Sequence, residues 1–222
     1  MKKVNLLLAI LVVFTIPLLI ISFSQNTVIK SEEVYSFYFN DSRAVDKIYT
    51  EYTANDMARK FSAFMKSWSP EEFKVEEDTG YDVESVFTED EGYNMMRVKH
   101  VVDINFFIMI GSLLITAFIY FWLLHTDKKQ VLRRSYLVSM LLTISGVIFT
   151  VRNFGTNAGR MMMAEKLEML VLPEDSQLAT VLSPEFMSMA SGFFALICVL
   201  LFGILTYITL LITKPPRLFS DN

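Results

Sequence analysis

Four stretches without a charged residue constrain this chain more than any other feature of its sequence. They are residues 4–29, 104–124, 135–151 and 186–213. About 20 apolar residues are enough for a helix to cross roughly 30 Å of hydrocarbon, and only the third stretch is near the lower limit. Buried core helices of a soluble protein are the alternative interpretation. Four such stretches in a chain of 222 residues instead favour a multi-pass membrane protein.

Basic residues beside the four stretches predict the orientation of the chain in the membrane. They lie at residues 2–3, within residues 127–134 and at residues 214–217. Four spans would place all three groups on one side, and an excess of Lys and Arg marks the cytoplasmic side. Residues 24–103 carry 9 basic and 17 acidic residues, a net charge of −8, which fits a segment that leaves the cytoplasm.

We therefore predict an all-α membrane protein with four transmembrane helices, cytoplasmic N- and C-termini, and a mostly helical outer domain between spans 1 and 2. The first stretch has the basic start of a signal peptide, but its apolar part is long and no A-x-A-like site follows, which favours a retained anchor. The predicted spans are residues 1–23, 104–124, 135–151 and 186–213. The predicted outer segments are residues 24–103 and 152–185, and the cytoplasmic ones are residues 125–134 and 214–222.

Within the outer domain, one group of apolar residues recurs at helical spacing. These residues are Met57, Phe61, Phe64, Met65 and Trp68. Such a stripe predicts an amphipathic helix. The stripe either packs against the rest of the outer domain or lies on the membrane surface, and we favour packing.

The entry to the second span carries the chain's most suggestive polar group. Thr88 and Glu91 form a capping-box pattern, which predicts a helix that continues into the span. On that helix Arg97, His100 and Asp103 fall on one side, within an arc of about 120°. Asp103 could accept a hydrogen bond from His100, leaving the other ring nitrogen to act as a general base. Polar residues that merely mark the membrane interface are the simpler alternative.

The segment after the third span offers possible partners for such a base. It contains Arg152, Asn153, Asn157 and Arg160, whose side chains can donate hydrogen bonds to an oxyanion or a carbonyl. Membrane anchoring and solvated loop polarity are again the alternative. We expect no cofactor and no metal, since the sequence has no phosphate-binding glycine loop, paired CxxC or HExxH motif. The acidic outer face argues against nucleic acid as a partner, and spans without charged residues argue against ion transport.

Two motifs resemble a known family. One is His100-Val-Val-Asp103 before the second span, and the other is the sequence "LPEDSQLATVLSPEF" at residues 172–186, which enters the last span. Together with the four-span pattern they resemble the bacterial integral membrane proteins that include the lipoprotein intramolecular transacylase. The resemblance implies a membrane acyltransferase of the bacterial cell envelope. Its partners would be membrane lipid and a diacylated lipoprotein, and it would move one acyl chain to the amino group of the lipidated N-terminal cysteine.

The resemblance also implies the site and shows where the chain departs from the family pattern. His100 and Asp103 would be the catalytic residues, and Arg97, Arg152, Asn153, Asn157 and Arg160 would be candidates for contacting the substrate or the oxyanion. The family pattern includes a second histidine in the last outer loop, but residues 153–184 contain none. Arg160 stands near that position, and an arginine cannot act as a base near neutral pH. The alternative is therefore a non-catalytic member that binds lipoprotein or another envelope partner through its outer domain.

Overall fold

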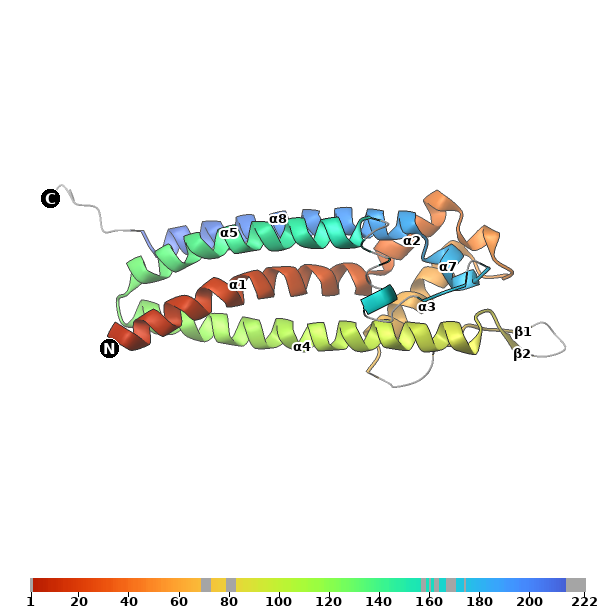
Figure 1. Ribbon diagram of the computed structural model, residues 1–222, viewed down its shortest axis with the longest axis horizontal. Helices are drawn as coiled ribbons and strands as arrows, with labels where there is room; N and C mark the ends of the chain where they lie inside the picture. The colour runs from red at the N-terminus through yellow and green to blue at the C-terminus, as the bar shows by residue number, and fades with distance from the viewer. Residues whose placement is uncertain are drawn as a thin grey trace. The chain divides into compact units, whose positions relative to one another are not determined.

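The computed structural model is mostly helical (Figure 1). It describes residues 2–68, 73–78, 83–156, 159, 161, 164–166, 171–173 and 175–214. Four of its helices are long and apolar enough to cross a membrane. They are α1 (Lys2–Lys30), α4 (Glu89–His125), α5 (Lys129–Phe154) and α8 (Pro184–Ile212).

The four long helices confirm the prediction of a mostly helical protein with four membrane-crossing segments. They have 29, 37, 26 and 29 residues, which exceeds the roughly 20 that hydrocarbon requires. Large apolar side chains such as Leu7, Phe121, Leu141 and Val199 are exposed on them. A surface of this kind is expected where lipid, and not water, surrounds the protein.

The chain forms two compact units, and each long helix contributes to both. The first unit comprises Met1–Phe23, Phe107–Ile148 and Leu196–Asn222. Hydroxyl pairs join its helices: Thr116 Oγ1 lies 3.0 Å from Thr15 Oγ1, and Tyr120 Oη lies 2.8 Å from Thr209 Oγ1. Such pairs satisfy hydroxyl groups within an apolar surrounding.

The second unit comprises Ser24–Phe106 and Phe149–Ala195. It holds the short elements α2 (Glu32–Ser42), η1 (Val45–Lys47), α3 (Ala54–Lys66) and α7 (Gln177–Val181). Ser31 caps the start of α2 by accepting the backbone N–H of Val34 at 3.3 Å. Thr53 caps the start of α3 in the same way, by accepting the backbone N–H of Asp56 at 3.2 Å. Both are the hydroxyl caps that helix starts favour.

The helix α3 confirms the predicted amphipathic stripe and its packing. Met57, Phe61 and Met65 are buried, with at most 1% of their surface exposed, and α3 packs against α2. The Phe61 ring lies at the centre of an aromatic cluster with ring-centroid distances of 4.8–5.9 Å to Tyr35, Phe39, Phe73 and Phe87. Trp68, beyond the end of α3, is exposed and contacts Phe106 edge-on.

A small β-hairpin departs from the predicted all-α fold. Strands β1 (Glu76–Asp78) and β2 (Val83–Ser85) pair antiparallel, with Glu77 opposite Glu84. Each strand has only three residues and most of them are charged, so no alternation of apolar and polar residues reveals them. Hydrogen bonds outside the pair fix the hairpin, since the Glu77 carboxylate accepts the backbone N–H of Glu51.

Candidate functional site

The helix α4 begins as the sequence predicts and presents the candidate residues on one continuous helix. The backbone N–H of Thr88 donates to Glu91 Oε2 at 2.8 Å, and the N–H of Glu91 donates to Thr88 Oγ1 at 3.3 Å. This reciprocal pair confirms the predicted capping box. Because α4 then continues unbroken to His125, residues 97, 100 and 103 share one side of it.

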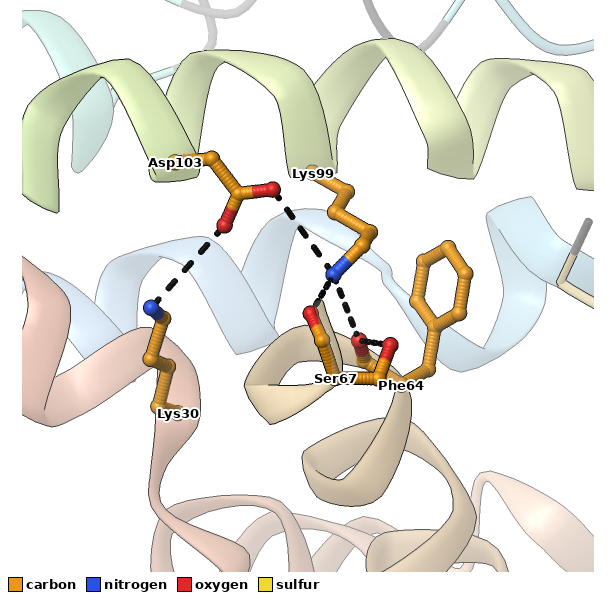
Figure 2. Close-up of polar contacts among 5 residues, drawn as sticks. All are labelled: Lys30, Phe64, Ser67, Lys99 and Asp103. Atoms are coloured by element: carbon orange, nitrogen blue, oxygen red, sulfur yellow. Dashed lines mark hydrogen bonds and ion pairs between the residues drawn. The ribbon is translucent and has the colours of Figure 1, made fainter. Parts of the chain in front are cut away.

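The structure does not form the predicted hydrogen bond between His100 and Asp103. His100 is exposed, and its ring has no hydrogen bond, ion pair or ring contact with any other residue that the structure describes. Asp103 is half-buried and lies 3.7 Å from Lys99 Nζ and 4.0 Å from Lys30 Nζ. The carboxylate faces two lysines because Lys99 precedes it by one helical turn and α1 ends beside it (Figure 2).

Lys99 is a buried cation with a clear structural partner. Its ammonium donates to the backbone carbonyls of Phe64, at 3.1 Å, and of Ser67 (Figure 2). These carbonyls belong to the C-terminal end of α3, where the helix dipole places partial negative charge. Lys99 is 6% exposed, so the carbonyls and Asp103 provide the contacts that a buried ammonium requires.

Lys30 is the third member of the charged group that Asp103 and Lys99 form. The sequence analysis did not predict a role for either lysine. Lys30 lies at the end of α1, with its ammonium 4.5 Å from the centre of the Phe106 ring. The signal for Lys99 was present, since it stands four residues before Asp103 and such pairs face each other on a helix. No local pattern could have revealed Lys30, which reaches Asp103 from 73 positions away.

The structure describes only some of the other residues predicted to contact the substrate or the oxyanion. Arg97 stacks its guanidinium 4.8 Å from the Tyr93 ring on the same helix. Asn153 donates its side-chain N–H to Phe149 O at 2.9 Å, within α5, and Arg152 is exposed in the last turn of that helix. Within the described part of the chain, no hydrogen bond or ion pair joins these three residues to His100. Asn157 and Arg160 lie outside the described residues.

A cavity of about 170 Å³ opens on another side of α4, within the second unit. From α4 it is lined by Val98, Val101, Val102 and Asn105. With 3.6 residues per turn, His100 lies about 150° around the helix from the centre of this face. The remaining lining residues are Gln25, Val28, Ile29, Tyr35, Met65, Thr150, Phe154, Leu182, Phe186, Met187, Ala190, Ser191 and Phe194.

Tyr35 forms a rigid part of the cavity wall. Its hydroxyl donates to Ile29 O at 2.9 Å, and its ring stacks on Phe186 at 5.3 Å. Burial raises the pKa of the Tyr35 hydroxyl, so it stays protonated and keeps this hydrogen bond at physiological pH. The wall is thus held by a hydrogen bond and a stacked ring that local sequence patterns did not indicate.

A second network fixes the segment that precedes α8. The Glu91 side chain is 4% exposed and accepts the Ser176 hydroxyl and, at 2.9 Å, the backbone N–H of Leu178 through Oε1. Ser176 also caps α7 by accepting the N–H of Ala179 at 3.0 Å. One carboxylate therefore stabilises the starts of both α4 and α7. The capping box predicted only the half of this network that belongs to α4.

Comparison with known proteins decides what kind of membrane protein this is. A family model described as lipoprotein intramolecular transacylase Lit matches residues 10–157. The chain belongs to this family. Membership confirms the resemblance seen in the sequence and supports a function in lipoprotein modification within the membrane. The matched range includes Arg97, His100 and Asp103, whereas Arg160 lies beyond it.

Solved structures agree with the family assignment at the level of the fold. Two structures of the membrane integral transacylase Lit from Bacillus cereus resemble the chain, one with a histidine-to-arginine mutation and one with a histidine-to-alanine mutation. The first has a TM-score of 0.72 at 13% identity and covers 96% of this chain and 93% of that one. The second has a TM-score of 0.73 at 13% identity and covers 96% and 95%. No curated protein sequence matches the chain.

Proposed function

We propose that this protein is a membrane acyltransferase that moves one ester-linked acyl chain of a diacylglyceryl lipoprotein to the amino group of its N-terminal cysteine, yielding the lyso form. The observation that carries the proposal is the family match across residues 10–157, the range that holds the His100-Val-Val-Asp103 motif. Four membrane-crossing helices fit a substrate anchored by its acyl chains. In the proposed topology both termini are cytoplasmic, and residues 24–103 and 152–185 are extracytoplasmic at the cell membrane.

The proposed reaction needs no covalent intermediate on the protein. The neutral cysteine amine attacks the ester carbonyl, the C–O bond to glycerol breaks and an amide forms. The proton lost by the amine is returned to the glycerol oxygen that leaves. Donor and acceptor belong to one molecule, so positioning supplies much of the rate.

His100 is the residue we propose as the proton carrier. It would accept the amine proton and return it to the leaving oxygen. Its exposed side chain is accessible to a lipid-borne group. Arg97, Arg152, Asn153, Asn157 and Arg160 remain candidates for donating hydrogen bonds to the oxyanion.

Asp103 can still orient His100 in this proposal. Its distances of 3.7 Å and 4.0 Å to the two lysines exceed normal hydrogen-bond lengths, so the carboxylate keeps acceptor capacity. Catalytic hydrogen bonds often tighten only when substrate is bound, so the present geometry does not argue against the role.

A non-catalytic role is the second candidate, and specific observations favour it. Asp103 contacts Lys99 and Lys30, and not His100. The outer segment between Arg152 and Glu185 contains no histidine. In this alternative the protein binds a lipoprotein or another envelope partner without transferring an acyl chain.

Mass spectrometry of lipoprotein N-termini from cells with and without the protein tests the proposal. We expect an N-acylated, single-ester form only in its presence, and its loss on His100→Ala substitution while the variant still inserts in the membrane. Identical N-termini in both cells would favour the non-catalytic role. Purified Arg160→His then provides a gain-of-function arm: if the wild type is inert on a diacylated lipopeptide and this variant is active, the natural protein is the non-catalytic member.

A further inference from the structure

Basic side chains gather at one end of the first unit, where the start of α1, the turn between α4 and α5, and the end of α8 lie together (Figure 1). Residues 1–23, 107–148 and 196–214 contain seven basic residues and one acidic residue, a net charge of +6, whereas the whole chain carries −4. The exposed basic residues at this end are Lys3, Lys128, Lys129, Arg133, Arg134 and Lys214. Such a concentration of positive charge attracts anions.

The densest part of this charge is the turn between α4 and α5, with the start of α5. We call its four cations the basic turn: Lys128, Lys129, Arg133 and Arg134. The backbone N–H of Lys128 donates to Leu123 O at 2.8 Å, which closes the turn after the end of α4. The turn therefore holds Lys128 directly before the first turn of α5.

The chain supplies little negative charge of its own to the basic turn. Asp127 Oδ1 lies 3.9 Å from Lys129 Nζ, but both side chains are exposed, and water and salt weaken such a pair. Lys129 and Arg133 stand four positions apart on α5, so they share a face and repel each other. The side chains of Lys128, Arg133 and Arg134 form no ion pair or hydrogen bond with any residue that the structure describes. Their charge is therefore available to an anion from outside the chain.

Exposed aromatic side chains precede the basic turn on α4 and indicate what carries that anion. Phe121 and Trp122 lie near the end of the helix and are 68% and 41% exposed. Aromatic rings at the ends of membrane-crossing helices lie at the level of the lipid headgroups. Rings followed by cations match a molecule that has apolar chains attached to an anionic headgroup. A soluble phosphate compound would use the cations alone.

We propose that the basic turn binds the phosphodiester headgroup of an anionic phospholipid. A guanidinium group offers parallel N–H donors that fit two phosphate oxygens, and each lysine adds a positive charge. Clusters of four or more basic residues directly beside the cytoplasmic end of a membrane-crossing helix are typical of anionic-lipid binding, and the proposed topology places this turn at the cytoplasmic face. The inference goes beyond acyl transfer and does not rest on it, since His100 belongs to the second unit.

The two tryptophans of the chain allow this site to be tested by fluorescence. Trp122 lies close to the basic turn, whereas Trp68 belongs to the second unit. The Trp68→Phe variant therefore reports on lipid beside the basic turn, and Trp122→Phe provides the matched reporter in the other unit. Both full-length proteins are reconstituted in phosphatidylcholine vesicles that contain an increasing fraction of phosphatidylglycerol with brominated acyl chains, which quench tryptophan fluorescence on contact.

Quenching should show a preference for the anionic lipid at one reporter only. We expect Trp122 to report an affinity for phosphatidylglycerol at least about fivefold above that for brominated phosphatidylcholine, and Trp68 to report no such preference. High salt should reduce the preference at Trp122, because it screens exposed charges. Both lipids occupy both leaflets of the vesicles, so the orientation in which the protein inserts does not affect the result.

Substitutions in the basic turn locate the site. Arg133→Gln combined with Arg134→Gln should lower the preference at Trp122 to less than about twofold, since two of the four cations are lost. Arg133→Lys combined with Arg134→Lys keeps the charge and should retain most of the preference. Lys47→Gln is the control, because it removes an exposed basic residue from the second unit. All these positions are exposed, so the variants are expected to fold.

Each remaining outcome would overturn the proposal. Equal quenching of Trp122 by the two brominated lipids would show that the turn does not select anionic lipid, and an unchanged preference in the double glutamine variant would place the site elsewhere. The same preference at Trp68 would mean a general attraction of anionic lipid to the protein. Loss of the preference in the presence of excess soluble glycerol phosphate would assign the basic turn to a soluble phosphate compound.

Discussion

Glu91→Gln is the substitution whose effect follows most directly from the contacts in the structure. The carboxylate accepts from four donors: the N–H and hydroxyl of Thr88 at 2.8 and 3.2 Å, the Leu178 N–H at 2.9 Å, and the Ser176 hydroxyl. A glutamine keeps one acceptor oxygen and turns an NH₂ group toward the donors on the other side. The isosteric change thus weakens the two hydrogen bonds on the oxygen side. On the NH₂ side it removes the bond from the backbone N–H, whereas the hydroxyl there can turn and accept from the NH₂ group.

The magnitude follows from these four contacts. Hydrogen bonds to a charged group contribute roughly 1.5–3 kcal/mol, and neutral ones about 0.5–1.5 kcal/mol. Relaxation lets some orphaned donors find other acceptors, so we expect Glu91→Gln to lower the free energy of unfolding by about 2–4 kcal/mol. The loss should be local first, since Glu91 joins the starts of α4 and α7.

Two measurements check this prediction in detergent-solubilised protein. Hydrogen–deuterium exchange should rise across residues 176–181, and the thermal unfolding midpoint should fall. Glu89→Gln is the control, because Glu89 is an exposed glutamate in the same first helical turn. A change in unfolding free energy below about 0.5 kcal/mol, with unchanged exchange in α7, would refute the importance of this carboxylate.

Two further predictions concern Lys99 and the orientation of the chain. Lys99→Met should lower the free energy of unfolding by about 1–3 kcal/mol, because the Ser67 carbonyl loses its buried charged donor and the Phe64 carbonyl keeps only its donors from Ser67. Thermal unfolding checks this against Lys66→Met, an exposed lysine on α3, and equal effects would argue against a special role for Lys99. A cysteine introduced at exposed Glu76 should react with a membrane-impermeant maleimide in intact cells, whereas one at exposed Lys128 should react only after permeabilisation; the reverse pattern would invert the proposed topology.

The sequence was sufficient for features that depend on spacing within one segment. Charge-free length revealed the four membrane-crossing helices, and the pattern of Thr88 and Glu91 revealed where α4 begins. It was insufficient where distant segments meet. Lys30 reaches Asp103 from α1, and Ser176 reaches Glu91 from the segment before α8. The three-residue strands of the hairpin also lacked a local signal, because pairing and not pattern defines them.

The two possible roles of Asp103 can be separated by combining substitutions, because stability and transfer depend on different neighbours. Asp103 balances the charges of Lys30 and Lys99, so Asp103→Asn should lower the free energy of unfolding by about 1–3 kcal/mol whether or not His100 is present. If the carboxylate also orients His100, Asp103→Asn should slow transfer in the wild-type background, and by less than His100→Ala does.

The decisive comparison is made in the His100→Ala background, using transfer of an acyl chain within a diacylated lipopeptide and thermal unfolding on the same preparations. There Asp103→Asn should cause no further loss of transfer while it still lowers the unfolding midpoint, since an orienting residue acts only through the base that it orients. Equal proportional losses of transfer in both backgrounds would mean that Asp103 acts only by holding α1 and α3 against α4. In that case Asp103 serves only to balance the charges of Lys30 and Lys99. His100, if it is the base, then works without a partner carboxylate.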